Sequence, residues 1–205
     1  MGLGGDYWPG RTVDGISYDG GFSVSCGAER FVGKKIVIAA GLGSRRLAGL
    51  VGLSMPVSPL KGQILVTERV RPFLDYATHI TRQTEEGGVM MGDSLEDVGF
   101  DVSSTHKVMS GIAARNLAVF PLLRDVNVVR TWAALRVMSP DGAPIYEESA
   151  TCPGAYSATC HSGVTLAGVH ALELAPGILR GVLPAGVAAF GSGRFAEGVR
   201  DVQAF

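Results

Sequence analysis

A single arginine inside an apolar stretch constrains the fold of this chain more than any other feature. Residues 132–145 read WAALRVMSPDGAPI, so Arg136 stands among apolar residues just before a Ser-Pro-Asp-Gly turn. Arginine is rarely buried without a partner, and its guanidinium binds carboxylates through two parallel hydrogen bonds. If residues 128–138 form an interior strand, Arg136 therefore either binds a carboxylate of the protein or receives one from a ligand. These residues alone leave both alternatives open.

The composition argues against several classes of function. The chain has 205 residues, of which 46% are hydrophobic and 18% charged, and its formal net charge is -1. This composition supports a sizeable core in one or two domains, and the absence of a basic cluster argues against nucleic acid as the main partner. No apolar run reaches the roughly eighteen residues of a membrane span, and the N-terminus lacks the pattern of a signal peptide.

The three cysteines, Cys26, Cys152 and Cys160, are too few and too widely spaced for a disulfide framework or a zinc site. We therefore expect no metal and a reducing, cytoplasmic location, with any membrane association peripheral and through partners. Cys160 is interpreted as a small core residue, because no second histidine with an Asn or Asp partner is placed to make it a nucleophile.

Hydrophobic periodicity predicts the order of the helices and strands. Strands are expected at residues 12–18, 22–26, 35–40, 64–67, 77–82, 88–92, 126–138 and 155–160. Helices are expected at residues 44–50, 105–119 and 166–179. Ser44 is the expected N-cap of the first helix, Pro121 lies just beyond the second, and Pro176 is expected to interrupt the third. Lys61 and Arg82 are interpreted as solvated surface charges.

This order of elements predicts a discontinuous domain, residues 1–56 and 139–205, into which an antiparallel sheet domain, residues 57–138, is inserted. Residues 158–167 of the first domain form a strand–turn–helix rich in small side chains. The start of such a helix offers unpaired N–H groups and a partial positive charge to an anion. The alternative is an ordinary helix start capped by Ser162 or Thr165. His161 is either a hydrogen-bond donor to a cofactor or a structural hydrogen-bonding residue.

Several motifs together resemble the flavin-dependent amino-acid oxidoreductases of the D-amino-acid oxidase, glycine oxidase and sarcosine oxidase superfamily. The motifs are VIAAG at 37–41, PLKGQ at 59–63, GDS at 92–94, FP at 120–121, WAALR at 132–136, PDGAPI at 140–145 and CHSGVTLA at 160–167. The last of these motifs, together with FP at 120–121 and GDS at 92–94, is most similar to the β-type subunits of heteromeric dehydrogenases. Those include opine oxidase, D-hydroxyproline dehydrogenase and the C subunit of hydrogen cyanide synthase.

This resemblance implies FAD as the cofactor and a substrate of amino-acid or opine type (D-amino acid, opine, sarcosine or glycine), with companion subunits as partners. It implies hydride transfer from the substrate's Cα to the flavin, with Arg136 holding the substrate carboxylate. The residues that it places at the flavin are Ala40, Gly41, His161, Ser162, Gly163, Val164 and Thr165.

The sequence departs from the family at its N-terminus. The family opens with a βαβ unit that carries Gly-x-Gly-x-x-Gly, whereas GLGG at residues 2–5 follows no strand and precedes no helix. The predicted fold is therefore α/β (α+β), the C-terminal part of a Rossmann-like FAD-binding domain with an inserted substrate-binding sheet domain. We expect a fragment of a longer enzyme, a truncated product, or a chain that needs another. The alternative is a cofactor-free remnant that acts as an interaction module or has no activity. Without the first βαβ unit, the apolar flank of the strand at 36–40 is expected to be exposed, which predicts poor solubility or oligomerisation of the isolated chain.

Overall fold

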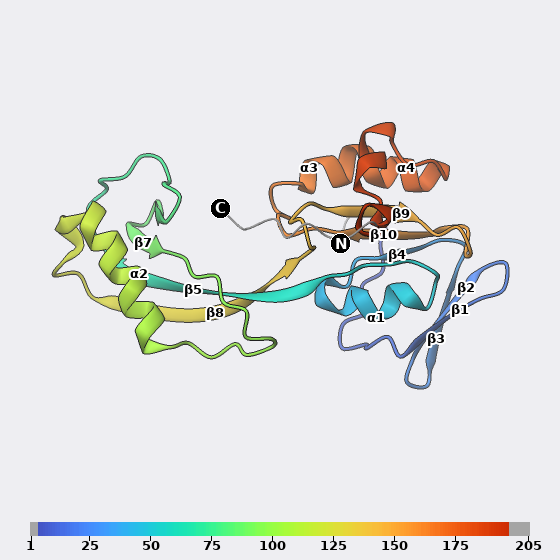
Figure 1. The fold of residues 1–205 in the computed structure, drawn as a ribbon, viewed down its shortest axis with the longest axis horizontal. Coiled ribbons are helices and arrows are strands. Elements are labelled where there is room, and N and C mark those ends of the chain that lie inside the picture. The colour runs from blue at the N-terminus through green and yellow to red at the C-terminus, as the bar shows by residue number, and fades with distance from the viewer. Residues whose placement is uncertain (1–3, 197–205) are drawn as a thin grey trace. The chain divides into compact units, whose positions relative to one another are not determined.

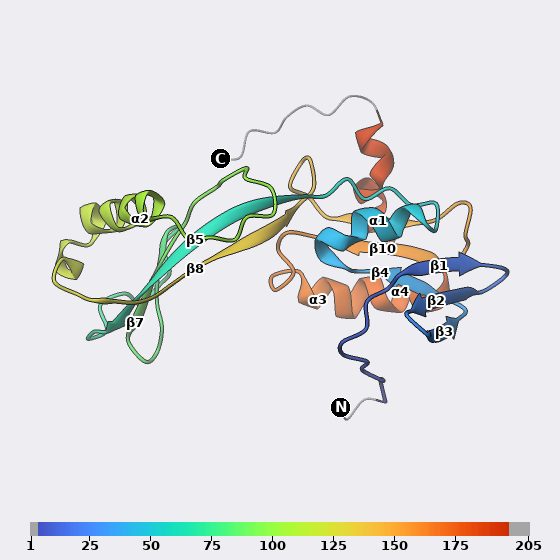
Figure 2. The ribbon, with the colours of Figure 1, turned by 90° about the horizontal axis from the view of Figure 1, so that it is seen from below.

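The computed structural model describes residues 4–196 and divides the chain into two compact units. Unit 1 consists of Met1–Ser58 and Val137–Phe205, and unit 2 of Pro59–Arg136. The units are described one at a time below. Figures 1 and 2 give two views of their helices and strands.

A three-layer arrangement around a small sheet forms the centre of unit 1. The sheet has the order β4 (Ile36–Ile38), β10 (Ala155–Thr159) and β9 (Ile145–Glu148), with β10 parallel to β4 and antiparallel to β9. Helix α1 (Ser44–Gly49) covers one face, and the helices α3 (Ala167–Val169) and α4 (Ala175–Arg180) cover the other (Figure 1).

Neighbouring residues of β10 face opposite layers, because side chains alternate along a strand. Ala155 is buried in the cluster that includes Leu47 of α1, whereas Tyr156 is buried in the cluster that includes Ile178 of α4. A π-helical turn, His170–Leu174, joins α3 to α4. The helix is therefore irregular just before Pro176, where the sequence predicted an interruption.

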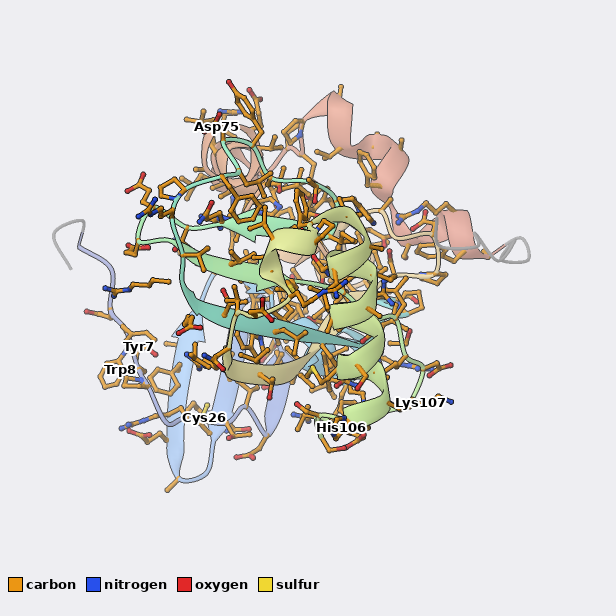
Figure 3. All side chains as sticks on the ribbon, turned by 90° about the vertical axis from the view of Figure 1, so that its left-hand side faces the viewer. Tyr7, Trp8, Cys26, Asp75, His106 and Lys107 are labelled. Carbon is orange, nitrogen blue, oxygen red and sulfur yellow. The ribbon has the colours of Figure 1, made fainter. Side chains whose placement is uncertain are left out.

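An antiparallel meander completes the N-terminal part of unit 1. It consists of β1 (Gly15–Tyr18), β2 (Phe22–Cys26) and β3 (Glu29–Gly33), in that order. The segment before it lies against β3, where the rings of Trp8 and Phe31 are 5.5 Å apart; Figure 3 labels Trp8 beside Tyr7. Residues 4–35 contain this meander and no βαβ unit, as the sequence predicted.

Unit 2 is a four-stranded sheet with one covered face. The sheet has the order β6 (Thr81–Gln83), β7 (Gly88–Met91), β5 (Ser58–Arg69) and β8 (Val128–Met138). Helix α2 (His106–Val119) packs on one face, where Leu65, Val89 and Ile112 share a core (Figure 2). Figure 3 shows His106 and Lys107 at the start of this helix, away from that core.

The two faces of strand β5 differ in burial because its side chains alternate between them. Lys61, Gln63, Leu65 and Thr67 are buried on the face toward α2, whereas residues 60, 62, 64 and 66 on the opposite face are half-buried. This opposite face is called the open face of unit 2 below.

In the part of the chain that the structure describes, four short 3-10 turns connect or follow these elements, at Gly41–Gly43, Pro121–Leu123, Ala185–Phe190 and Ser192–Phe195. Within residues 4–196, no single helix combines the length and apolar composition needed to cross a membrane. The bent pair Ala167–Arg180 and Ala185–Phe195 meets that test only when both helices are counted together.

One local prediction was wrong, and one strand was missed. Ser44 is the first residue of α1 rather than its N-cap, and its hydroxyl oxygen accepts a hydrogen bond from the backbone N–H of Ala40 at 3.0 Å. The strand β3 was not predicted, because its five residues carry two charged side chains and lie between two glycine-containing turns.

Candidate functional site

The residues predicted to contact a flavin lie in two loops that follow the carboxyl ends of strands in the unit 1 sheet. Strands β4 and β10 are parallel, with Ile36 paired to Ala155 and Ile38 to Ser157. Their carboxyl ends therefore lie at the same end of the sheet, which is where ligands of α/β sheets bind. Ala40 and Gly41 follow β4 at this end of the sheet, and residues 161–165 follow β10.

The loop after β4 turns sharply at a glycine. Gly41 has a positive φ of 56°, a conformation that side chains other than glycine rarely adopt, and it begins the 3-10 turn. The hydrogen bond from Ala40 to the Ser44 hydroxyl holds the start of this turn. Only small side chains, those of Ala39 and Ala40, precede the turn, so the backbone at this point can approach a planar ligand closely.

The loop after β10 presents backbone N–H groups rather than side-chain caps. His161, Ser162, Gly163, Val164 and Thr165 are all exposed, Val164 to 95%. Within residues 4–196, the N–H groups of residues 163–165 donate no hydrogen bond; the first to do so is that of Leu166, to the Ser162 carbonyl at 3.0 Å. Free N–H groups at a helix start attract negative charge.

The alternative of an ordinary side-chain cap does not describe this helix start. No side chain accepts a hydrogen bond as an N-cap at Leu166. The Ser162 hydroxyl instead contacts Nδ1 of His161 at 3.1 Å, and the Thr165 side chain makes no hydrogen bond within residues 4–196. The N–H groups of this loop are therefore available to a ligand.

Cys160 does not have the environment of a nucleophile. Burial raises the pKa of its thiol, and a nucleophilic cysteine needs the opposite shift. Among the described residues, no three His, Cys, Asp or Glu side chains are grouped so that they could hold a metal ion. Neither covalent catalysis by Cys160 nor a protein-bound metal is indicated in this part of the chain.

Arg136 lies near the end of β8 in unit 2 and meets a protein carboxylate. Its Nη2 donates to Oδ2 of Asp93 at 3.0 Å, and its Nη1 donates to the backbone carbonyl of Ser94 at 2.9 Å. The side chains of Arg136 and Asp93 are 23% and 39% exposed, so the pair is only partly buried. A guanidinium has five N–H donors, and these two contacts use two of them. The other donors have no partner within residues 4–196.

The guanidinium of Arg136 lies directly over a glycine of the neighbouring strand. A Cβ atom at Gly62 would be 2.6 Å from Cζ and 2.7 Å from Nη2 of Arg136, well inside van der Waals contact. Arg136 therefore reaches from β8 across β5, on the open face of unit 2, to the segment that follows β7. Gly62 and Asp93 had no predicted role, although the motifs PLKGQ and GDS contain them. A single sequence does not show that Arg136 on β8 crosses β5 and bonds a residue that follows β7.

Lys61 occupies the opposite face of β5, and the interpretation of it as a surface charge was wrong. Its side chain is 1% exposed, and Nζ lies 2.8 Å from Oδ2 of Asp101, 3.2 Å from the Ser103 carbonyl and 3.5 Å from Oε2 of Glu96. The hydrogen bond from Lys61 lowers the pKa of Asp101 to about 2, and the same bond raises the pKa of Lys61. Arg82, in contrast, is exposed as expected.

Comparison with known proteins places this geometry in context. The family model described as "FAD dependent oxidoreductase" matches residues 1–176. The B subunit of opine oxidase from Agrobacterium tumefaciens (strain Ach5) is 44% identical over 193 residues, which cover 94% of this chain and 52% of that protein. The hydrogen cyanide synthase subunit HcnC of Pseudomonas aeruginosa is 31% identical over 193 residues, covering 91% of this chain and 45% of the relative.

The glycine oxidase of Geobacillus kaustophilus has a similar fold, with a TM-score of 0.80 at 23% identity, over 88% of this chain and 51% of that one. The chain spans about half the length of the curated relatives that it matches.

Proposed function

Because this chain belongs to the family of FAD-dependent oxidoreductases, we propose that it carries the carboxylate-binding sheet and the flavin-ring end of an amino-acid-oxidising enzyme. The proposed reaction is oxidation of the Cα–N bond of an amino acid or an N-substituted amino acid. The observation that carries this proposal is the position of Arg136, a partly exposed guanidinium with free donors on the open face of a sheet.

Arg136 would bind and orient the substrate through its carboxylate. A guanidinium with two contacts already made has a fixed plane, so its remaining donors keep their direction before a substrate arrives. A substrate held in a fixed orientation reacts faster, because much of the entropic cost of alignment is already met. Arginine suits this role better than lysine, since its planar fork matches the two carboxylate oxygens.

The loops of unit 1 fit a flavin ring on two counts. The free N–H groups of residues 163–165 can bond to the polar edge of the ring, and the helix start behind them favours the negative charge that the ring gains on reduction. Gly41 and Ala40 leave the backbone accessible at the same end of the sheet, after the carboxyl end of β4. His161 and Ser162 would flank this end of the sheet.

FAD bound by these loops would supply the acceptor for the hydride that leaves the substrate's Cα. The substrate nitrogen loses a proton as the Cα–N single bond becomes an imine, and water hydrolyses the imine to an oxo acid and an amine. The tasks left to this chain are binding and orientation, for which unit 2 offers the guanidinium of Arg136 and unit 1 offers the free backbone N–H groups of residues 163–165. We also propose a companion subunit, because the opine oxidase and hydrogen cyanide synthase relatives are themselves named as subunits.

The proposal is tested by comparing Arg136→Lys with Arg130→Lys in the flavin-loaded protein that contains this chain. Arg130 is the matched control, because it lies on the same strand, is exposed and stacks over the Trp132 ring at 5.2 Å. Loss of paired hydrogen bonds costs about 2 kcal/mol, which corresponds to a roughly 30-fold rise in the substrate KM. Flavin absorbance should be unchanged in both variants.

Two results would reject the function. One is a KM that Arg136→Lys leaves unchanged for every amino acid and opine tried. The other is a full-length protein that never retains FAD, which would favour the second candidate below.

The second candidate is an interaction module without cofactor. One observation favours it: β4 lies at the edge of the unit 1 sheet beside a groove of about 370 Å³, lined by Val13, Ile16, Val24, Leu47 and residues 36–40. An unpaired strand edge next to apolar side chains is a ready surface for another polypeptide. Flavin retention and substrate-dependent bleaching of the flavin separate the two candidates.

A further inference from the structure

We propose that Gly62 is a positioning residue, whose missing side chain determines where the guanidinium of Arg136 lies. The inference rests on the proposed role of Arg136 as a carboxylate clamp, and concerns what sets the geometry of that clamp. Strand β5 would perform this task in two ways, since Gly62 receives the guanidinium on the open face and its neighbours Lys61 and Gln63 hold the segment that Arg136 bonds.

Space, rather than backbone conformation, is the reason for glycine at position 62. Its φ lies outside the left-handed region, so alanine can adopt the same backbone without strain. A methyl group would nevertheless lie 2.6 Å from Cζ of Arg136 and 2.7 Å from Nη2. The three atoms nearest to this position, leaving out the immediate chain neighbours, all belong to the Arg136 guanidinium. Substitution at Gly62 therefore acts first on one flexible side chain rather than on the backbone of a neighbouring strand.

The segment that bonds Arg136 is held by Lys61 and Gln63, the neighbours of Gly62 in the same strand. The backbone N–H of Gln63 donates to Oγ of Ser94 at 3.0 Å, and Nε2 of Gln63 donates to Oε1 of Glu96 at 2.8 Å. Lys61 and Glu96 exchange two backbone hydrogen bonds, of 2.9 and 3.0 Å, which extend the sheet by one bridge. The segment from Asp93 to Glu96 is thus fixed along β5.

Helix α2 fixes the other end of this segment. Nη2 of Arg115 donates to the Asp93 carbonyl at 2.5 Å, and Nδ2 of the buried Asn116 donates to the Gly92 carbonyl at 3.5 Å. Asp93 and Ser94 therefore have little freedom to follow Arg136 if it moves. A guanidinium pushed off Gly62 would lose both of its contacts, and with them its fixed plane.

The test compares Gly62→Ala with Gly88→Ala in the flavin-loaded protein. Gly88 is the matched control because it lies in the same sheet, has an ordinary φ, and a Cβ there would meet nothing closer than 3.6 Å. We expect Gly62→Ala to raise the substrate KM about 10- to 30-fold with little change in kcat, and Gly88→Ala to change neither. A KM that Gly62→Ala leaves unchanged, while Arg136→Ala raises it, would overturn the positioning role and leave the clamp intact.

A double-mutant cycle shows whether Gly62 acts through Arg136. In an Arg136→Ala background, Gly62→Ala should have no further effect on KM; an undiminished effect there would overturn the inference. If Gly62→Ala lowers the melting temperature, adding Arg136→Ala should restore it, and a failure to restore it also counts against the inference.

A second readout does not depend on activity. The side-chain NMR resonances of Arg136 should shift in Gly62→Ala and stay in place in Gly88→Ala. Unmoved resonances would refute the positioning role even if the clamp is correct, and moved resonances would support it even if Arg136→Ala leaves KM unchanged.

Discussion

The buried pair of Thr81 and Asn116 gives the most quantitative prediction for unit 2. Thr81 on β6 is 2% exposed and Asn116 on α2 is fully buried. The Thr81 hydroxyl donates to Oδ1 of Asn116, whose Nδ2 donates to the Ile112 carbonyl at 2.9 Å. Thr81→Val keeps the shape of the side chain but removes the donor. Oδ1 of Asn116 then has no donor within residues 4–196 and no access to water.

The magnitude follows from the cost of an unsatisfied buried acceptor. Leaving such a group unpaired lowers the free energy of unfolding by about 1–3 kcal/mol, and we expect about 2 kcal/mol here because both residues are almost fully buried. The exposed Thr131 on β8 is the control, and Thr131→Val should change the free energy of unfolding by less than about 0.5 kcal/mol.

Trp132 fluorescence reports on unit 2 if Trp8, the other tryptophan of the chain, is replaced by phenylalanine. With a urea m-value of about 2 kcal/mol per molar, a loss of about 2 kcal/mol moves the unfolding midpoint down by about 1 M. A shift below about 0.2 M, or one equal to that of Thr131→Val, would refute the reasoning that Asn116 depends on this hydroxyl.

Two further predictions concern acid stability and association. Because the pKa of Asp101 is about 2 in the folded state against an ordinary 3.8, its contribution to stability is present above about pH 4 and is lost as the pH falls toward 2. Asp101→Asn should flatten the fall of the urea midpoint across this range, and equal slopes for the two proteins would contradict the Lys61 pairing. Val37 of the edge strand β4 is 42% exposed, so the 205-residue chain should associate by itself and Val37→Lys should reduce that association in light scattering. A chain that is monomeric with Val37 in place would contradict this prediction.

Elements with a strong local pattern were predictable from the sequence. Helix α2 was expected at 105–119 and is found at His106–Val119, and the strand at 22–26 was predicted with the bounds of β2. Each has a periodicity that a single segment can specify. A strand followed at once by small and polar residues also predicted the strand–turn–helix at 158–167, although the sequence left open whether Ser162 or Thr165 caps the helix.

Contacts between distant segments were not predictable. The burial of Lys61 depends on Asp101, 40 residues away, and on a helix that covers one face of β5. A lone lysine in a strand gives no sign of either, so a solvated charge was the natural interpretation. The role of Gly62 is hidden for the same reason: its space is filled by Arg136, a residue of another strand.

The pairing of Arg136 with Asp93 bears on the two alternatives that the sequence left open, a structural ion pair or a ligand clamp. An ion pair as exposed as this one contributes about 0–1 kcal/mol, because water screens it. A substrate carboxylate that takes two hydrogen bonds from the same guanidinium contributes about 2 kcal/mol or more. Under the proposed clamp role, the weaker contact would not prevent the stronger one, and its effect would be to orient the guanidinium plane. The pairing of Arg136 with Asp93 is therefore compatible with the proposed clamp, because the pair is partly exposed and leaves further guanidinium donors unpaired within residues 4–196.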